Sequence, residues 1–226
     1  GLPLTQAAGV TVLTPPSFAP VAAGTNFPLV VESQAEAGAE LRLFYRRGGS
    51  PGPFSGPVAM APGQGDEYTG TIPGTVIGIR GLEVYVEGIQ NGVTTSLGSA
   101  LSPIRVRSIL QNQRSPSPPD AEFRMVGFPY DVDPNSVAAV FEDDLGAPDE
   151  TQWKLGRWND ATSSYQEYGD VGAITRGHGY WLAVRHDKNY DASGLSALQT
   201  EMVGIQEYAG LVLRPGWNQI ATPFGF

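Results

Sequence analysis

The sequence contains no cysteine, only two histidines and no long run of apolar residues. Without cysteine the chain can form no disulfide, no zinc site built on thiolates and no thiol nucleophile. A transmembrane helix needs about 18 or more consecutive apolar residues, so we expect no segment that inserts into a membrane. The two histidines, His178 and His186, leave little material for general-base or metal chemistry.

Motifs of the common enzyme classes are missing as well. There is no Gly-x-Ser-x-Gly nucleophile elbow, and no zinc-protease motif, P-loop or complete dinucleotide-binding motif occurs. The pair Gly63-x-Gly65 lacks the third glycine of the dinucleotide-binding motif. His178 lies between two glycines and His186 follows the same predicted strand, so we expect both at turns or on the surface. We therefore expect no catalytic residue, no bound cofactor and no enzymatic activity.

Glycine and proline are abundant, and charge is unevenly distributed. The 226 residues include 29 glycines and 19 prolines, which punctuate apolar segments and so favour many short strands and turns. The net charge is −9. Residues 123–226 hold 7 basic and 14 acidic side chains, whereas residues 1–107 hold 6 and 7. Because an acidic surface repels phosphate, nucleic acid is not an expected partner.

Alternation of apolar and polar residues predicts several strands in the first half. We expect them at residues 26–31, 40–46, 67–72, 82–89, 93–97 and 104–107, after a loose lead-in and edge strand within residues 1–20. In the strand at 82–89, Leu82, Val84 and Val86 should point inward, and Glu83, Tyr85 and Glu87 outward. Asn91-Gly92 should then form a type I′ turn. Short strands at this spacing predict a β-sandwich.

The order of motifs in this half resembles the immunoglobulin-like or fibronectin-III-like modules of secreted bacterial proteins. The motifs are Tyr45-Arg46 in one strand, Tyr68 to Ile72-Pro73 in another, and Leu82 to Tyr85 before Asn91-Gly92. The resemblance covers roughly residues 15–107 and implies an immunoglobulin-like sandwich. It implies no particular activity, because such folds carry many unrelated functions.

Residues 108–122 are polar and rich in proline, as in the run from Gln111 to Pro119. This composition predicts a semi-extended linker between a first domain at residues 1–107 and a second at residues 123–226. The alternative is a long loop between strands of a single domain. The change in net charge across this segment favours a domain boundary.

The second half is predicted to be β-rich, acidic and aromatic, with at most one or two short helices. We expect a helix over residues 137–145, capped by Asn135-Ser136, and a hairpin of residues 153–158 and 164–168. A nearly continuous apolar run at residues 180–184 predicts a central strand that is buried on both faces. Residues 195–198 should form a helical turn. The whole chain is therefore assigned to the all-β class.

A third hairpin is predicted at the end of the chain. Residues 208–213 and 217–221 flank the turn sequence at Arg214-Pro215-Gly216. We expect the strand that begins at Trp217 to lie beside residues 124–130 and to complete the second domain. In that position Trp217 would be a buried core residue.

Motifs of the second half resemble a β-rich accessory module of large secreted surface proteins of Gram-negative bacteria. They are Phe128-Pro129, Trp153-x-Leu-x-x-Trp158, Tyr165, Gly177-x-Gly-Tyr-Trp181, Pro215-Gly-Trp-Asn218 and Pro223-Phe224. The resemblance implies secretion or display on a bacterial cell surface, with neighbouring domains of a larger chain as partners. In such modules the chain continues past the last Pro-Phe, which implies that Phe226 is a truncation point.

Four oxygen-bearing residues follow the spacing of an EF-hand calcium loop at its first, third, fifth and twelfth positions. They are Asp131, Asp133, Asn135 and Glu142. Ser136 stands where the loop requires glycine, and Pro134 occupies the fourth position. We therefore expect an acidic turn and helix cap here, with weak calcium binding as the alternative.

A second acidic cluster combines Glu142-Asp143-Asp144 with Asp149-Glu150. Two carboxyl groups held about 5–9 Å apart across a cleft can hydrolyse glycosidic bonds. A pocket with Asp143, Asp144 or Glu150 opposite another carboxylate would favour a hydrolase. A solvated loop is the expected arrangement.

Aromatic residues are concentrated in the second half, at Trp153, Trp158, Tyr165, Tyr168, Tyr180, Trp181 and Trp217. Large aromatics fill the cores of small β domains, but exposed rings also stack on sugars. Strand alternation places Trp153 and Leu155 on one face of the hairpin and Trp158 on the other. We select Trp158, Tyr165 and Tyr180 as candidates for stacking on a ligand.

These features predict a monomeric, non-catalytic pair of structural or adhesive modules from an exported bacterial surface protein. The first domain would be a spacer, and the second a structural or adhesive module with a surface glycan or a protein as partner. The alternative is carbohydrate binding through exposed aromatics of the second domain, with a surface glycan as partner; a hydrolase fragment is the third possibility. A groove floored by exposed tryptophan would favour sugar binding, whereas buried tryptophans would favour the spacer.

Overall fold

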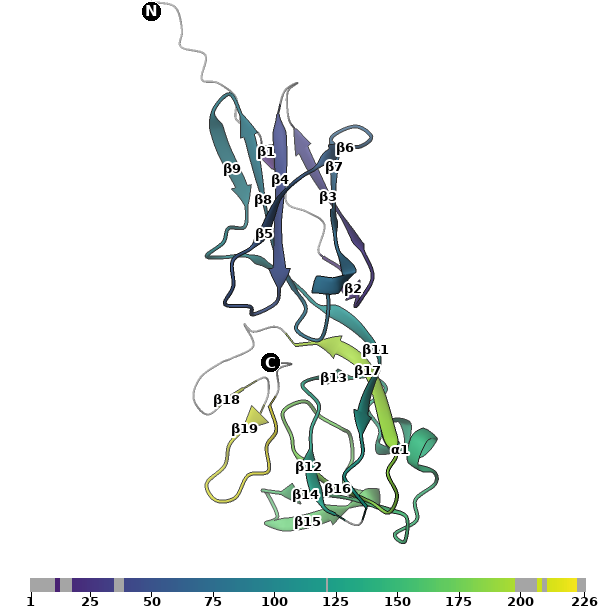
Figure 1. Cartoon of the computed structure of the whole chain (residues 1–226). Helices are drawn as coiled ribbons and strands as arrows, with labels where there is room; N and C mark the ends of the chain where they lie inside the picture. The colour runs from purple at the N-terminus through teal and green to yellow at the C-terminus, as the bar shows by residue number, and fades with distance from the viewer. Residues whose placement is uncertain are drawn as a thin grey trace, which may run out of the picture. The chain divides into compact units, whose positions relative to one another are not determined.

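The structure is a computed structural model and describes residues 11–12, 18–34, 39–120, 122–197, 207–208 and 211–222. Strands make up 50% of it and helices 8%, which confirms the predicted all-β class. The chain divides into two compact units, residues 1–108 and 109–226, so the boundary falls one residue beyond the predicted end of the first domain (Figure 1). Within the described residues, no helix is long and apolar enough to cross a membrane.

The first unit contains two antiparallel sheets arranged as a β-sandwich. One sheet has the strand order β1 (Thr11–Val12), β3 (Phe27–Gln34), β7 (Glu67–Ile72) and β6 (Ala61–Pro62). The other has the order β10 (Ile104–Val106), β8 (Leu82–Gln90), β4 (Glu40–Arg47) and β5 (Ser55–Ala59), with β9 (Val93–Leu97) also paired to β8. The remaining elements are β2 (Val21–Ala22) and the short 3₁₀ helix η1 (Gly74–Val76).

The strands of the first unit follow the predicted alternation. Leu41 and Leu43 of β4 and Leu82, Val84 and Val86 of β8 all lie in its hydrophobic core. The two strands pair over eight residues in antiparallel register, which aligns their apolar faces. The predicted hairpin after β8 is confirmed, because the residues at positions 91 and 92 both have positive φ, as a type I′ turn requires.

The outer face of β8 is covered, although sequence alternation places its residues away from the core. The Glu83 side chain is only 3% exposed, and its two carboxylate oxygens pair with Arg46 at 2.7 Å and Arg105 at 3.3 Å. Beside it the Tyr85 ring stacks on Phe44, with centroids 4.5 Å apart. These contacts between neighbouring strands fill the outer face with the unit's own side chains.

We expect Glu83→Ala to destabilise the first unit by about 3 kcal/mol, the lower end of the range for a broken buried ion pair, because Arg46 and Arg105 remain partly exposed. Urea unfolding of the full chain measures the loss. Glu87→Ala is the matched control on the same face of β8 and should cost less than about 1 kcal/mol. Equal losses in the two variants would show that the buried ion pairs contribute no specific stability.

The second unit is built from two larger sheets, a helix and a small hairpin. One sheet contains the order β13 (Tyr130–Val132), β17 (Asn189–Ser196) and β11 (Ser108–Pro116). The other has the order β12 (Arg124–Val126), β16 (Tyr180–Val184), β14 (Trp153–Asn159) and β15 (Ser164–Glu167). The other elements are α1 (Val137–Leu145), η2 (Tyr168–Asp170), and the hairpin of β18 (Glu207–Tyr208) and β19 (Leu211–Val212).

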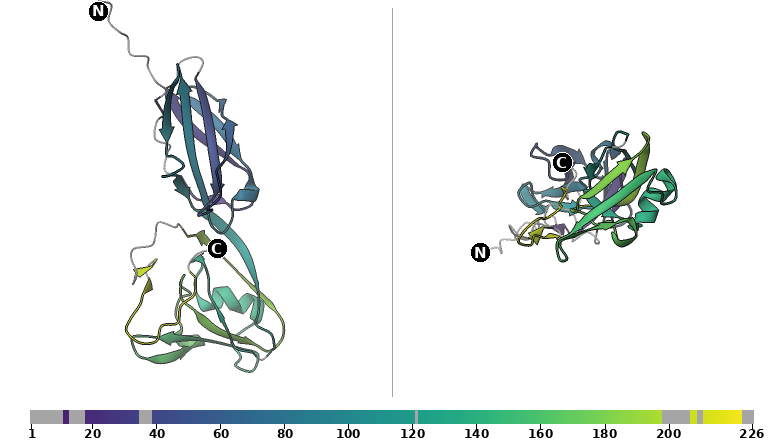
Figure 2. Two further views of the ribbon diagram at one scale, coloured as in Figure 1. Left: turned by 60° about the vertical axis from the view of Figure 1, so that its left-hand side comes forward. Right: turned by 90° about the horizontal axis from the view of Figure 1, so that it is seen from below.

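Helix α1 begins and ends where the sequence predicts. The Ser136 hydroxyl caps it by accepting a hydrogen bond from the Ala139 amide at 3.1 Å. Its apolar side is buried and the helix packs against β17 (Figure 2). Phe141 lies fully buried in an aromatic core, with its ring centroid 5.1 Å from Tyr190 and 6.1 Å from Trp153. The predicted hairpin of β14 and β15 is also confirmed.

Two predictions for this half are wrong because residues predicted as a linker and as a helical turn belong to strands. Residues 108–116 of the predicted linker form β11, which pairs with β17. Most side chains of β11 are polar, so its sequence lacks the alternation of apolar and polar residues that predicts a strand, although Ser108 and Leu110 are buried. The predicted helical turn at residues 195–198 is wrong at Leu195 and Ser196, which belong to β17; residue 198 lies outside the described residues.

The predicted terminal hairpin is also wrong. Residues 217–221 form no regular strand, and Trp217 is 55% exposed. This segment pairs with the residues just before β16, since the Gly179 amide donates to the Gln219 carbonyl and the Ala221 amide to the Gly177 carbonyl. It makes no strand pairing with residues 124–130, so that part of the prediction is wrong, but it does lie beside them, because a Cβ atom added to Gly127 would meet the Ala221 side chain. The predicted Pro223-Phe224 stop lies outside the described residues.

Trp153 is buried and Trp217 is exposed, so the two side chains should contribute differently to the free energy of unfolding. We expect Trp153→Ala to cost about 3–5 kcal/mol, because it leaves a large cavity in the aromatic core. Trp217→Ala should cost less than about 1.5 kcal/mol, since its ring is half exposed and makes one edge-on contact with Trp158. Denaturant unfolding of both variants provides the comparison, and a Trp217 loss as large as the Trp153 loss would contradict the exposed position.

Candidate functional site

The sheet of β12, β16, β14 and β15 has one face in the core and the other open to solvent. On the core face Trp153 lies opposite Val184, and Leu155 lies opposite Leu182. On the outer face Gly156 lies opposite Trp181. β16 is therefore a central strand, as predicted, but its predicted burial on both faces is wrong because its outward residues are partly exposed.

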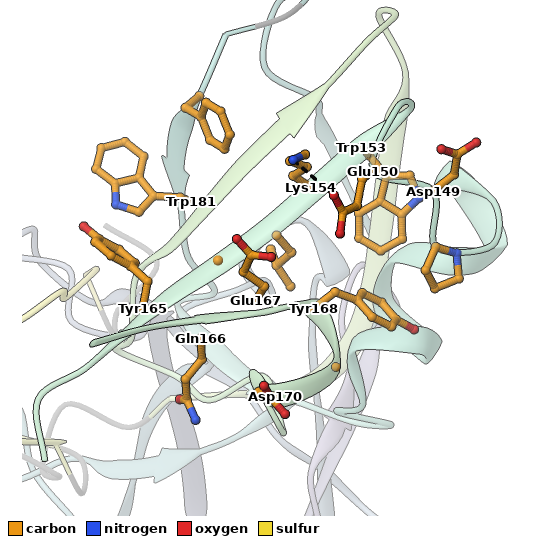
Figure 3. Close-up of a pocket in the computed structure, with 15 residues that line it drawn as sticks. Asp149, Glu150, Trp153, Lys154, Tyr165, Gln166, Glu167, Tyr168, Asp170 and Trp181 are labelled. Carbon is orange, nitrogen blue, oxygen red and sulfur yellow. Dashed lines mark hydrogen bonds and ion pairs between the residues drawn. The ribbon is translucent and has the colours of Figure 1, made fainter. Parts of the chain in front are cut away.

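This outer face and the chain beside it form a cavity of about 770 Å³, which we call the groove (Figure 3). Its aromatic lining consists of Phe123, Trp153, Tyr165, Tyr168 and Trp181. Its charged lining consists of Asp149, Glu150, Glu167, Asp170 and Lys154. In the view of Figure 3, Glu150 and Glu167 lie between Tyr165 and Trp181 on one side and Trp153 and Tyr168 on the other.

Gly156 explains why this surface is hollow. It lies in one row across the sheet, opposite Trp181 on β16 and opposite Glu167 on β15. A Cβ atom at this position would meet only the Gln166 carbonyl oxygen, at an ordinary contact distance of 3.6 Å. The missing side chain therefore leaves space between the indole of Trp181 and the carboxylate of Glu167.

Hydrogen bonds shift the pKa values of two groups that line the groove. The carboxylate of Asp149 accepts bonds from the hydroxyl and amide of Thr151 at 2.6 and 2.8 Å, which lower the pKa of Asp149. The hydroxyl of Tyr168 donates to Glu142, and this bond, with burial, raises the pKa of Tyr168 to about 12. At neutral pH Asp149 is therefore ionised and Tyr168 is a neutral phenol.

The three predicted stacking residues have different positions. Tyr165 lines the groove and is 55% exposed. Trp158 is half-buried on the same face, outside the groove lining, and its ring makes edge-on contacts with Tyr165 and Trp217. Tyr180 is wrong as a stacking candidate, because it is fully buried and its hydroxyl accepts a hydrogen bond from the Thr175 amide.

Three groove residues, Trp181, Tyr168 and Phe123, are not among the candidates predicted from the sequence. A signal for Trp181 was present, because Tyr180 and Trp181 are neighbours in one strand and must point to opposite faces. Phe123 and Tyr168 lie just outside strands, where alternation does not fix the direction of a side chain.

Trp158 and the segment after Trp217 surround a second, small cavity of about 20 Å³, enough for one water molecule. The Trp158 indole donates to the Trp217 carbonyl at 3.0 Å, and Gln219 accepts from the Trp158 amide at 2.7 Å. His178 also lines this cavity, and burial, together with the charge of Arg157, lowers the pKa of its imidazole. His178 is thus half-buried at a bridge to Ile220, whereas His186 is exposed.

The geometry gives the calcium hypothesis no support. Asp131 pairs with Arg176 at 3.1 Å, and Glu142 accepts the hydroxyl of Tyr168. Asp133 and Asn135 are exposed in the turn before α1. Across the part of the chain that the structure describes, no three acidic or histidine side chains form a group that could hold a metal ion.

Glu150 and Glu167 both line the groove, so one pocket holds two of the carboxylates that the hydrolase alternative requires. The Glu150 side chain is 78% exposed and forms an ion pair with Lys154 at 3.4 Å, and Glu167 is exposed as well. A general acid for this reaction needs burial that raises its pKa. In this groove both carboxylates are instead exposed to solvent.

Comparison of the chain with protein-family models, with curated proteins and with solved structures gives no significant match. Function is therefore inferred from the groove and its chemistry.

Proposed function

We propose that the second unit binds carbohydrate in the groove, and that the chain is a non-catalytic adhesive module pair from a bacterial surface protein. The observation that carries this proposal is the partly exposed indole of Trp181, which lies beside Tyr165 in the groove (Figure 3), next to the space left by Gly156. Surface location is inferred from the resemblance of both halves to modules of secreted bacterial proteins.

The lining combines the two contacts that sugars need. Aromatic rings bury the apolar face of a pyranose, and Trp181, Tyr165 and Phe123 supply such rings. Carboxylates accept hydrogen bonds from sugar hydroxyls, and Glu167 and Asp170 lie in the same groove. The cavity volume lies within the range of about 300–1,000 Å³ that is usual for ligand sites.

The first unit is proposed to be an immunoglobulin-like spacer. Its sheet order β1-β3-β7-β6 corresponds to strands A-B-E-D of immunoglobulin domains, and β4, β8 and β9 to strands C, F and G. The outer face of β8 is occupied by ion pairs and stacked rings of the same unit. This filled surface favours a mechanical role over ligand binding.

Trp181→Ala should weaken glycan binding by about tenfold or more, or about 1.4 kcal/mol, because it removes the stacking surface of the groove. A glycan array identifies bound sugars, and isothermal titration calorimetry then gives the affinities. Trp217→Ala is the matched control, since it removes an exposed tryptophan outside the groove lining. Equal binding by wild type and Trp181→Ala, or an array without any bound glycan, would contradict the proposal.

Gly156→Val should block the same site without unfolding the protein. The new side chain would extend into the hollow between Trp181 and Glu167, where the first added atom meets no close neighbour. Glycine within a strand costs roughly 0.5–1 kcal/mol relative to alanine, so thermal stability should stay constant or rise. Retained stability with lost glycan binding supports the groove as the site, and full binding by this variant would exclude it.

A further inference from the structure

The charged groups around the groove are mostly of one sign. Four carboxylates and one ammonium line it, a formal charge of −3; they belong to Asp149, Glu150, Glu167, Asp170 and Lys154. The ammonium of Lys154 is already paired with Glu150. An anionic ligand would therefore meet repulsion from the remaining carboxylates and would have to displace Glu150 to reach the cation.

Two carboxylates of the groove are available to a ligand. Within the described residues, the side chains of Glu167 and Asp170 have neither an ion pair nor a hydrogen bond, whereas Asp149 is engaged by Thr151. Ionised carboxylates form their strongest hydrogen bonds with charged donors. A ligand that presents an ammonium group would satisfy them better than one with hydroxyls alone.

The position of Glu167 relative to Trp181 fixes where such an ammonium would lie. The two residues are in one row across the sheet, separated by Gly156 on the strand between them. Two strand spacings amount to about 10 Å, which leaves room for a pyranose ring and its substituents. A sugar stacked on the indole can thus direct an amino substituent toward the carboxylate of Glu167.

We infer that the groove selects glycans whose sugars carry free amino groups over neutral, N-acetylated and acidic glycans. This inference rests on the proposed carbohydrate-binding function and specifies its substrate class. The aromatic rings act in the same direction as the carboxylates, because the faces of Trp181 and Tyr165 attract cations. N-acetylation removes the positive charge, and a uronic acid places a carboxylate among carboxylates.

Three oligosaccharides of equal length test this selectivity by calorimetry on the full chain: a glucosamine tetramer, an N-acetylglucosamine tetramer and a galacturonic acid tetramer. The titrations are done at slightly acidic pH, so that the sugar amine is protonated, and at physiological salt, which screens long-range attraction. The free amine should bind about tenfold tighter than the N-acetylated sugar. The uronic acid should bind more weakly than both.

Glu167→Gln should weaken the glucosamine tetramer much more than the N-acetylated tetramer, so that the preference for the free amine is largely lost, because glutamine keeps an acceptor for a sugar hydroxyl but not the negative charge. Asp187→Asn is the matched control, because it removes one negative charge from an exposed position outside the groove lining. If both variants weaken the glucosamine tetramer equally, the attraction comes from the acidic protein as a whole and the inference is overturned.

Equal wild-type affinity for the free-amine and N-acetylated tetramers would also overturn the inference, yet carbohydrate binding would stand if Trp181→Ala lost both. Failure of all three tetramers together with a silent glycan array would instead overturn the proposed function. The two failures are therefore distinguishable.

Discussion

The second unit depends on one geometric constraint: successive side chains of a strand point to opposite faces of its sheet. The core face of the sheet of β12, β16, β14 and β15 contains Trp153 and Leu155 of β14 and Leu182 of β16, all of which are buried. The Trp153 ring packs beside Phe141. Once those residues are inside, Gly156 and Trp181 must face outward, whatever their polarity. The packing of the core therefore determines which residues line the groove, and the groove is deep at Gly156 because glycine has no side chain there.

The same constraint has a different result in the first unit. There the outward residues of β8 include Glu83 and Tyr85, both of which are buried by neighbours. Arg46 and Arg105 neutralise the carboxylate, and Phe44 covers the tyrosine ring. On a sheet face where adjacent strands carry complementary side chains, those side chains pair with one another and cover the face. A face that carries glycine between a tryptophan and an exposed carboxylate stays open, and this contrast is the reason for proposing that the second unit, and not the first, binds a ligand.

Much of the fold could be predicted from local patterns. The strands at β4, β7 and β8 and the cap and length of α1 depend on residues close together in sequence, so their signals are complete within each segment. β11 and the segment after Trp217 were mispredicted because their partners, β17 and residues 177–179, are distant in sequence. In both segments, backbone hydrogen bonds to these distant partners hold polar or proline-flanked residues in place, and the alternation of neighbouring residues does not predict such bonds.

The site was harder to predict than the fold, because composition identifies aromatic residues but not their partition between core and surface. Tyr180 and Trp181 are adjacent and chemically similar, yet one is fully buried and the other lines the groove. Only the register of β16 against β14 decides between them. A large cluster of exposed apolar rings is unfavourable in water and often marks a surface that another molecule covers. The outward position of Trp181, Tyr165 and Phe123 in one cavity is therefore a physical reason to propose ligand binding at this face.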